Sequence, residues 1–139
     1  MKTISELVRI SDRIRRINAR FVKIIGYKTG VDKNGIPTAV CKTFTPLEYT
    51  VTKRVVPAHD TNRYTSSIKF LQKGTRYVKV SCSCPDYMYR WEFANAQVGA
   101  GDIIYDNGDA PDETNPKYNP GLCKHLLALR TKVKDKHGI

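Results

Sequence analysis

Residues 75–84 read Thr-Arg-Tyr-Val-Lys-Val-Ser-Cys-Ser-Cys. From Val78 onward, apolar or cysteine side chains alternate with polar ones, and successive side chains on a β-strand point to opposite faces. The stretch is therefore predicted to form a strand. Cys82 and Cys84 are expected to leave the end of that strand on one face.

A second pair of ligand-type side chains follows after a 38-residue insert, residues 85–122. Cys123 and His125 stand two positions apart, directly after the turn signal Asn-Pro-Gly at 119–121. Leucines at positions 126, 127 and 129 predict a helix that begins near Lys124. A strand end with two sulfurs and a helix start with a sulfur and an imidazole can close around one ion.

Three thiols and one imidazole form a complete set of soft ligands for one tetrahedral zinc ion. We take the predicted ligands to be Cys82, Cys84, Cys123 and His125. Two other interpretations stay open, because buried cysteines often pack as small hydrophobes and cysteines also form disulfides. A bridge between the first two is disfavoured, since their closeness in sequence prevents ordinary disulfide geometry. The remaining cysteine, Cys41, is expected to have a packing role or none.

The sequence resembles the SWIM-type zinc finger in the order of its ligands, which is Cys-x-Cys, a long insert and then Cys-x-His. As in that family, the first pair ends a strand and the second pair begins a leucine-rich helix. The resemblance covers residues 75–132 and implies one structural zinc ion on the four ligands named above. The insert is longer than is usual for that family. Residues 82–94, 107–111 and 119–128 are most similar to small stand-alone SWIM-like proteins of tailed bacteriophages, which implies a virion or tail or head assembly role.

Residues 1–24 are predicted to form one amphipathic, basic helix. Thr3 and Glu6 have the spacing of a capping box. Apolar side chains recur every three or four residues, at Leu7, Ile10, Ile14, Ile17 and Phe21. Arginines recur on a neighbouring stripe and are candidate partner-binding residues: Arg9, Arg13, Arg16 and Arg20. The alternative is that they form the solvated face of a helix that packs on its own domain.

Between this helix and the cysteines, the hydrophobic period changes to two. The predicted strands are Ala19–Tyr27, Thr38–Phe44, Glu48–Val56 and Tyr64–Leu71. Together with 75–84 they would form an antiparallel meander of about five strands. With a helix at each end, the chain is expected to be a single α+β domain, residues 1–139. In the insert, Pro85 and Asp86 suit the start of a helix that stops at Gly99 and Gly101.

Charge is distributed unevenly along the chain, whose formal net charge is +11. The insert contains seven acids against Arg90 and Lys117, a net charge of −5, so the remaining residues carry +16. A basic body favours encounter with nucleic acid or acidic protein surfaces, whereas the insert could dock against basic regions of neighbours. Four acids of the insert do not follow the calcium-loop pattern: Asp106, Asp109, Asp112 and Glu113.

The same patterns narrow the classes of function. A closed site with four protein ligands is typical of a structural ion, and His59 and Asp60 are typical of a turn. The sequence also has no activated serine and no glycine-rich phosphate loop. We therefore expect that the protein is not an enzyme and has no small-molecule substrate. No membrane span or signal peptide is recognisable, so an intracellular and virion location is expected. The favoured partners are other protein subunits of a larger assembly. The alternative is a non-sequence-specific nucleic-acid-binding module.

Overall fold

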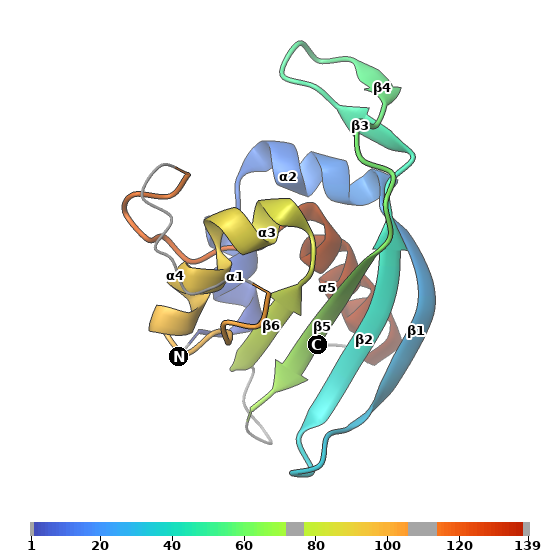
Figure 1. Cartoon of the computed structure of the whole chain (residues 1–139). Helices are drawn as coiled ribbons and strands as arrows, with labels where there is room; N and C mark the ends of the chain where they lie inside the picture. Colours follow the sequence, from blue (N-terminus) through green and yellow to red (C-terminus); the bar gives the residue numbers. More distant parts are fainter. Residues whose placement is uncertain (1, 72–76, 106–113, 138–139) are drawn as a thin grey trace.

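A four-stranded antiparallel sheet in the order β1-β2-β5-β6 forms the centre of the protein (Figure 1). This computed structural model describes residues 2–71, 77–105 and 114–137. The sheet strands are β1 (Lys23–Val31), β2 (Pro37–Phe44), β5 (Tyr64–Phe70) and β6 (Val78–Cys82). A separate two-stranded hairpin is formed by β3 (Leu47–Tyr49) and β4 (Val55–Pro57).

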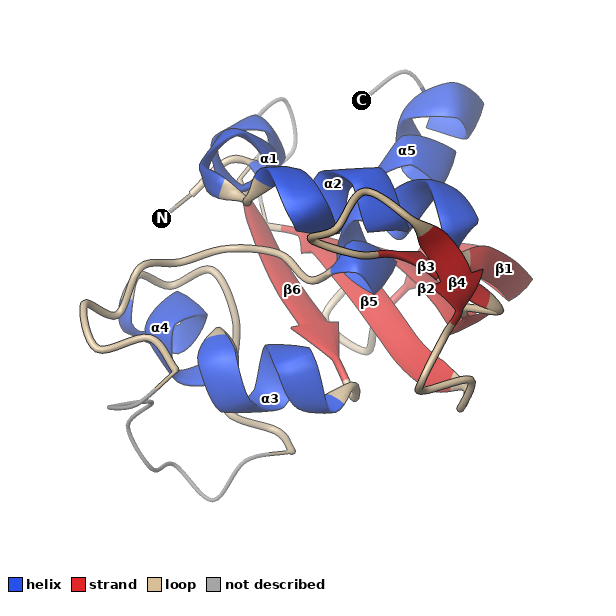
Figure 2. Cartoon of the chain, turned by 90° about the horizontal axis from the view of Figure 1, so that it is seen from above, coloured by secondary structure: helices blue, strands red, loops and turns tan. Residues whose placement is uncertain are grey.

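Helices flank this sheet, with one group on one side of it and a second group beside β6, as the view from above shows (Figure 2). They are α1 (Ile4–Ile10), α2 (Arg13–Asn18), the 3₁₀ turn η1 (Ala19–Phe21), α3 (Pro85–Arg90), α4 (Glu92–Gln97) and α5 (Lys124–His137). Helix α5 packs against β2, β5 and β6. The core lies between them, where Ile68, Val80, Leu126 and Leu129 are buried. Alternate β2 residues such as Val40 and Lys42 are exposed, so the sheet buries one side of that strand.

The predicted N-terminal helix is confirmed at its start but is divided in two. The Thr3 hydroxyl oxygen accepts a hydrogen bond from the Glu6 amide at 3.1 Å, as the capping motif predicts. The chain then becomes extended at Ser11, and Asp12 caps a second helix by accepting from the Arg15 amide at 2.8 Å. One helix over residues 1–24 is therefore wrong, because serine and aspartate bond to backbone amides more favourably at caps than inside a helix.

The α+β architecture is confirmed, with one change in the strand count. The segment Glu48–Val56 is not one strand but a hairpin, with Lys53 at a positive φ of 63° in its turn. The main sheet therefore has four strands and not five. The predicted antiparallel pairing of β5 with β6 is present, and Ser66 stands opposite Cys82. The insert helix is also divided, at Trp91, and Gly99 follows it at a φ of 73°.

The hairpin projects from the body and is held to α2 by one buried side chain (Figure 1). Asn18 accepts from the Tyr49 amide at 2.6 Å and donates to the Tyr49 carbonyl at 3.1 Å, and it also donates to the Ile14 carbonyl at 3.1 Å. A two-stranded hairpin has marginal stability by itself. Its position therefore depends on Asn18.

Substituting Asn18 by alanine should release the hairpin from α2. The Tyr49 amide loses its acceptor, and a hydrogen bond of this kind contributes about 1 kcal/mol, so its exchange with solvent deuterium should become several-fold faster. Hydrogen exchange followed by NMR measures this rate. Gln97→Ala, on the exposed side of α4, is the control and should leave the rate unchanged. Equal protection of the Tyr49 amide in both variants would show that Asn18 does not hold the hairpin.

Candidate metal centre

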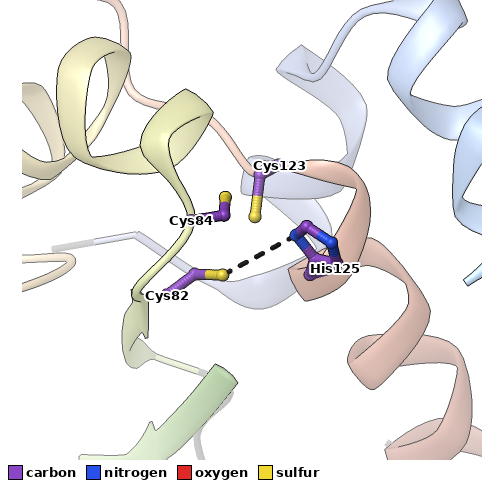
Figure 3. Close-up of side chains that lie close together, drawn as sticks. All are labelled: Cys82, Cys84, Cys123 and His125. Atoms are coloured by element: carbon purple, nitrogen blue, oxygen red, sulfur yellow. Dashed lines mark hydrogen bonds between the residues drawn. The ribbon is translucent and has the colours of Figure 1, made fainter. Parts of the chain in front are cut away.

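The four predicted ligands lie together, although they come from two distant parts of the chain (Figure 3). Cys82 is the last residue of β6, and Cys84 occupies the N-cap of α3. Cys123 directly precedes α5, and His125 lies in its first turn. One ligand atom from each residue lies within 4.8 Å of the others, and all four residues are buried.

The arrangement of these donors fits one metal ion. An ion that binds sulfur at about 2.3 Å in a tetrahedron separates its ligand atoms by about 3.8 Å, so side-chain movements of at most about 1 Å would close the site around it. The four donors are three sulfurs and one ring nitrogen, which are soft or intermediate ligands. The cluster can therefore hold one metal ion with four protein ligands.

Three of the four ligands have hydrogen-bond partners behind them. The Ser66 hydroxyl donates to Cys82 Sγ at 3.4 Å, and the Tyr87 amide donates to Cys84 Sγ at 3.4 Å. His125 turns Nδ1 toward Cys82 Sγ, at 3.9 Å, and places Nε2 3.4 Å from the buried Thr45 hydroxyl oxygen. With Nδ1 as the metal ligand, Nε2 carries the proton and donates it to Thr45. Such outer contacts fix the orientation of the ligands.

Without an ion, burial limits how many thiolates the cluster can carry. Burial opposes ionisation of Cys82, but hydrogen bonds from the other two thiols and the nearby His125 outweigh it and lower the pKa of Cys82 well below its usual value. Burial and the neighbouring Cys82 sulfur raise the pKa of Cys123. A metal ion that converts all the thiols to thiolates must therefore displace protons from this centre.

A cavity of about 300 Å³ adjoins the cluster, and Cys84, His125 and Lys124 form part of its wall. Charged groups in the same wall are engaged in structural contacts. The Arg15 guanidinium donates to both Asp86 carboxylate oxygens, each at 2.7 Å. It also lies 4.5 Å from the centre of the Trp91 ring. These contacts tie α2 to the start of the insert.

The two ends of the insert are also joined by an asparagine. Asn95 donates to the Gly121 carbonyl at 2.9 Å and accepts from the Gly121 amide at 2.9 Å. Its amide group also donates to the Tyr87 hydroxyl at 3.0 Å, and that hydroxyl donates to the Val80 carbonyl at 3.1 Å. Gly121 packs directly on Trp91, whose side chain is buried in the core. The insert is therefore fixed at both roots by contacts that do not involve the metal ligands.

A buried carboxylate organises the next part of the insert. Glu92 is fully buried and accepts hydrogen bonds from the backbone amides of Ile104 at 3.1 Å and Tyr105 at 3.0 Å. The sequence pattern did not single out Glu92, Asn95, Thr45 or Ser66. Their partners lie between 8 and 80 residues away, and polar residues in ordinary strands and helices carry no local signal of such contacts.

The other predicted residues do not belong to the metal cluster. Arg9, Arg13, Arg16 and Arg20 are all exposed, but the break at Ser11 places the first on α1 and the others on α2 and η1. Cys41 is buried in β2, and burial raises its pKa to about 11, so it stays a neutral thiol. Asp60 accepts from the Asn62 amide at 2.9 Å, which is turn chemistry. The acidic cluster at 106–113 lies outside the described residues.

Comparisons of the chain with protein-family models, with curated proteins and with solved structures find no match. The interpretation of the centre therefore rests on its own geometry and on the order of its ligands in the sequence. None of the described helices combines the length and apolar composition needed to cross a membrane.

Gly121→Ala should destabilise the protein, because a Cβ at this position would lie 2.6 Å from Trp91 Nε1. Overpacking of a tight site costs about 1–3 kcal/mol of unfolding free energy. Urea unfolding followed by the fluorescence of Trp91, the one tryptophan of the chain, measures this loss.

Gly30→Ala is the matched control, because nothing lies within 4 Å of a Cβ at that position. The same exchange there should raise stability by up to about 1 kcal/mol, since alanine restricts the unfolded chain. Similar losses in the two variants would show that the insert root does not require the close contact between Gly121 and Trp91.

Proposed function

We propose that this chain is a non-catalytic interaction protein whose C-terminal half is stapled by one structural zinc ion. The observation that carries the proposal is the buried convergence of Cys82, Cys84, Cys123 and His125. Three thiolates and one imidazole are a donor set of structural zinc sites, and four protein ligands leave no open position for a reacting water. The order of the ligands supports assignment to the SWIM type.

In this proposal, zinc acts mechanically at the roots of the insert. Cys84 directly precedes the first insert residue, and Cys123 directly follows the last one. Binding both to one ion locks β6 to α5 and fixes where the insert leaves and re-enters the body. A segment held in this way loses less conformational entropy when it binds a partner. The ion with three thiolates would carry a net charge of −1, which Lys124 in the adjoining wall helps to balance.

The contacts around the adjoining cavity support a role without catalysis. A general base must be free to accept a proton from a substrate. Asp86 is bound by Arg15 on both oxygens, and Asp60 accepts from the Tyr64 hydroxyl and from a backbone amide. Both carboxylates of this wall thus hold the local structure together.

The partner of the insert is proposed to be a protein. Ile103, Ile104 and Tyr105 are consecutive and 44%, 56% and 43% exposed. Contiguous exposed apolar side chains with acidic neighbours are typical of protein contact surfaces. We therefore propose that the insert docks on other subunits of a larger assembly. The resemblance to phage proteins makes a virion, tail or head assembly the expected one.

The purified protein should contain close to one equivalent of zinc, and Cys84→Ser should lose it. Removing one of four ligands leaves an open site of much lower affinity. Elemental analysis after dialysis against a weak chelator measures the zinc content. Hydrogen exchange should become faster in β6 and in the first turns of α5, while α1 stays protected.

Cys41→Ala provides the matched control for this experiment. It also removes a buried cysteine, but one outside the cluster, so its zinc content should equal that of the unchanged protein. An intact, folded protein without metal would contradict the proposed staple.

The docking role of the insert can be tested separately from the metal. Ile103→Ser combined with Ile104→Ser should keep the zinc, because the amide of Ile104 and not its side chain bonds to Glu92. The variant should lose most of the protein subunits that purify with the chain from its native source, as quantified by mass spectrometry. Val51→Ser combined with Val55→Ser, at exposed positions of the hairpin, is the control. Retention of all subunits by the insert variant would place the contact elsewhere.

A further inference from the structure

A basic groove lies on a part of the molecule that the metal centre does not reach. Its volume is about 450 Å³, and α2, η1, the start of β1 and α5 form its walls. Arg16 and Arg20 line one wall, and Lys132 lines the other. The rest of the lining is uncharged, and most of it is small or apolar: Ala19, Val22, Ile24, Ala128 and Thr131. A ligand can therefore approach closely between the cations.

The three cations of this groove have no acidic partner among the side chains that the structure describes. Among the described residues, the ion pairs involve Lys2, Arg15, Lys69, Lys79 and Arg90, and none involves Arg16, Arg20 or Lys132. Lys132 contacts an aromatic ring instead, with its ammonium nitrogen 5.9 Å from the centre of the Tyr27 ring. Groups that keep their full charge in a concave surface create a positive potential there.

The segments around the groove strengthen this potential. Residues 13–31, which form α2, η1 and β1, contain six lysines and arginines and no acid. Residues 124–137, which form α5, contain five lysines and arginines and one acid, Asp135. The insert holds more than half of the acids of the chain, and its helix α4 lies at the left of Figure 1, whereas β1 lies at the right.

We propose that this groove binds the phosphate backbone of a nucleic acid without reading its sequence. Protein surfaces mix both signs of charge, whereas a nucleic acid carries a uniform row of negative charges. The segments that frame the groove contain eleven lysines and arginines and one acid in their sequence, of which Arg15 is bound by Asp86, and this composition matches the second kind of partner. Arginine side chains suit phosphate because their planar group donates two parallel hydrogen bonds.

This site is separate from the zinc staple and adds a second contact to the proposed assembly role. The insert contacts protein, and the groove contacts nucleic acid. Neither metal binding nor insert docking requires the groove cations, so the two proposals fail independently.

The test is a salt titration of binding to a random-sequence duplex DNA of about 20 base pairs, followed by fluorescence anisotropy. Each phosphate contact contributes about 0.9 to the slope of log affinity against log salt. The unchanged protein should give a slope of about −3 or steeper. The triple variant Arg16→Gln, Arg20→Gln and Lys132→Gln should flatten that slope by two to three units, roughly, and bind about 100-fold more weakly near 0.1 M salt.

A second triple variant controls for net charge. Arg54→Gln, Arg63→Gln and Lys33→Gln remove the same residue types from exposed positions elsewhere, and the slope should change by less than about one unit. The single variants Arg16→Gln and Lys132→Gln should each flatten it by about 0.9; they test the groove even where the triple variant folds poorly. Unchanged zinc content and Trp91 fluorescence verify the fold.

Three outcomes would overturn the proposal. The unchanged protein could fail to bind DNA, or both triple variants could lose the same affinity, which would indicate a general effect of net charge. Poly-glutamate of equal charge could displace the DNA as well as unlabelled DNA does, which would identify an acidic protein as the partner. Loss of zinc in Cys84→Ser together with unchanged DNA binding supports the groove as an independent site.

Discussion

Burial of three thiols and one imidazole at a single point is the constraint on which the rest of the C-terminal half depends. An apolar core disfavours charge, and without an ion the pKa of Cys82 is lowered while burial raises that of Cys123. A bound cation removes this conflict, because it stabilises all the thiolates together. The end of β6 and the start of α5 must then stay in one relative position. That position determines where the insert leaves the body and where it returns.

A second set of contacts makes the roots of the insert rigid independently of the ion. Asn95 pairs with both polar groups of the Gly121 backbone, and Trp91 packs against the same glycine. The buried Ser11 hydroxyl accepts from the Leu122 amide at 3.1 Å. The break between α1 and α2 is what places Ser11 there, outside a regular helix. The N-terminal segment therefore forms part of the support of the insert.

The sequence predicted those features that depend on neighbouring residues, and it failed where distant contacts decide. The alternation of residues 78–84 and the leucines after His125 located all four ligands and the helix behind them. Polar and apolar residues also alternate in the segment 48–56, and its turn contains no glycine or proline. The sequence pattern therefore predicted one strand there. The periodic apolar residues of the first helix masked the cap signal of Asp12. The contacts of Thr45 and Asn18 join segments far apart in sequence, where no local pattern exists.

The arginines of α2 divide into two kinds of residue, and burial distinguishes them: Arg13 and Arg16 are exposed, whereas Arg15, outside the predicted stripe, is partly buried. Arg15 is partly covered, stacks on Trp91 and is bound by Asp86, so its charge is neutralised by a contact within the fold. Its neighbour Arg16 points to the groove shared with α5 and keeps its charge. Adjacent positions on a helix face about 100° apart, so one short helix can both anchor the insert and present cations in another direction. Helix α2 thus joins the basic groove to the start of the insert.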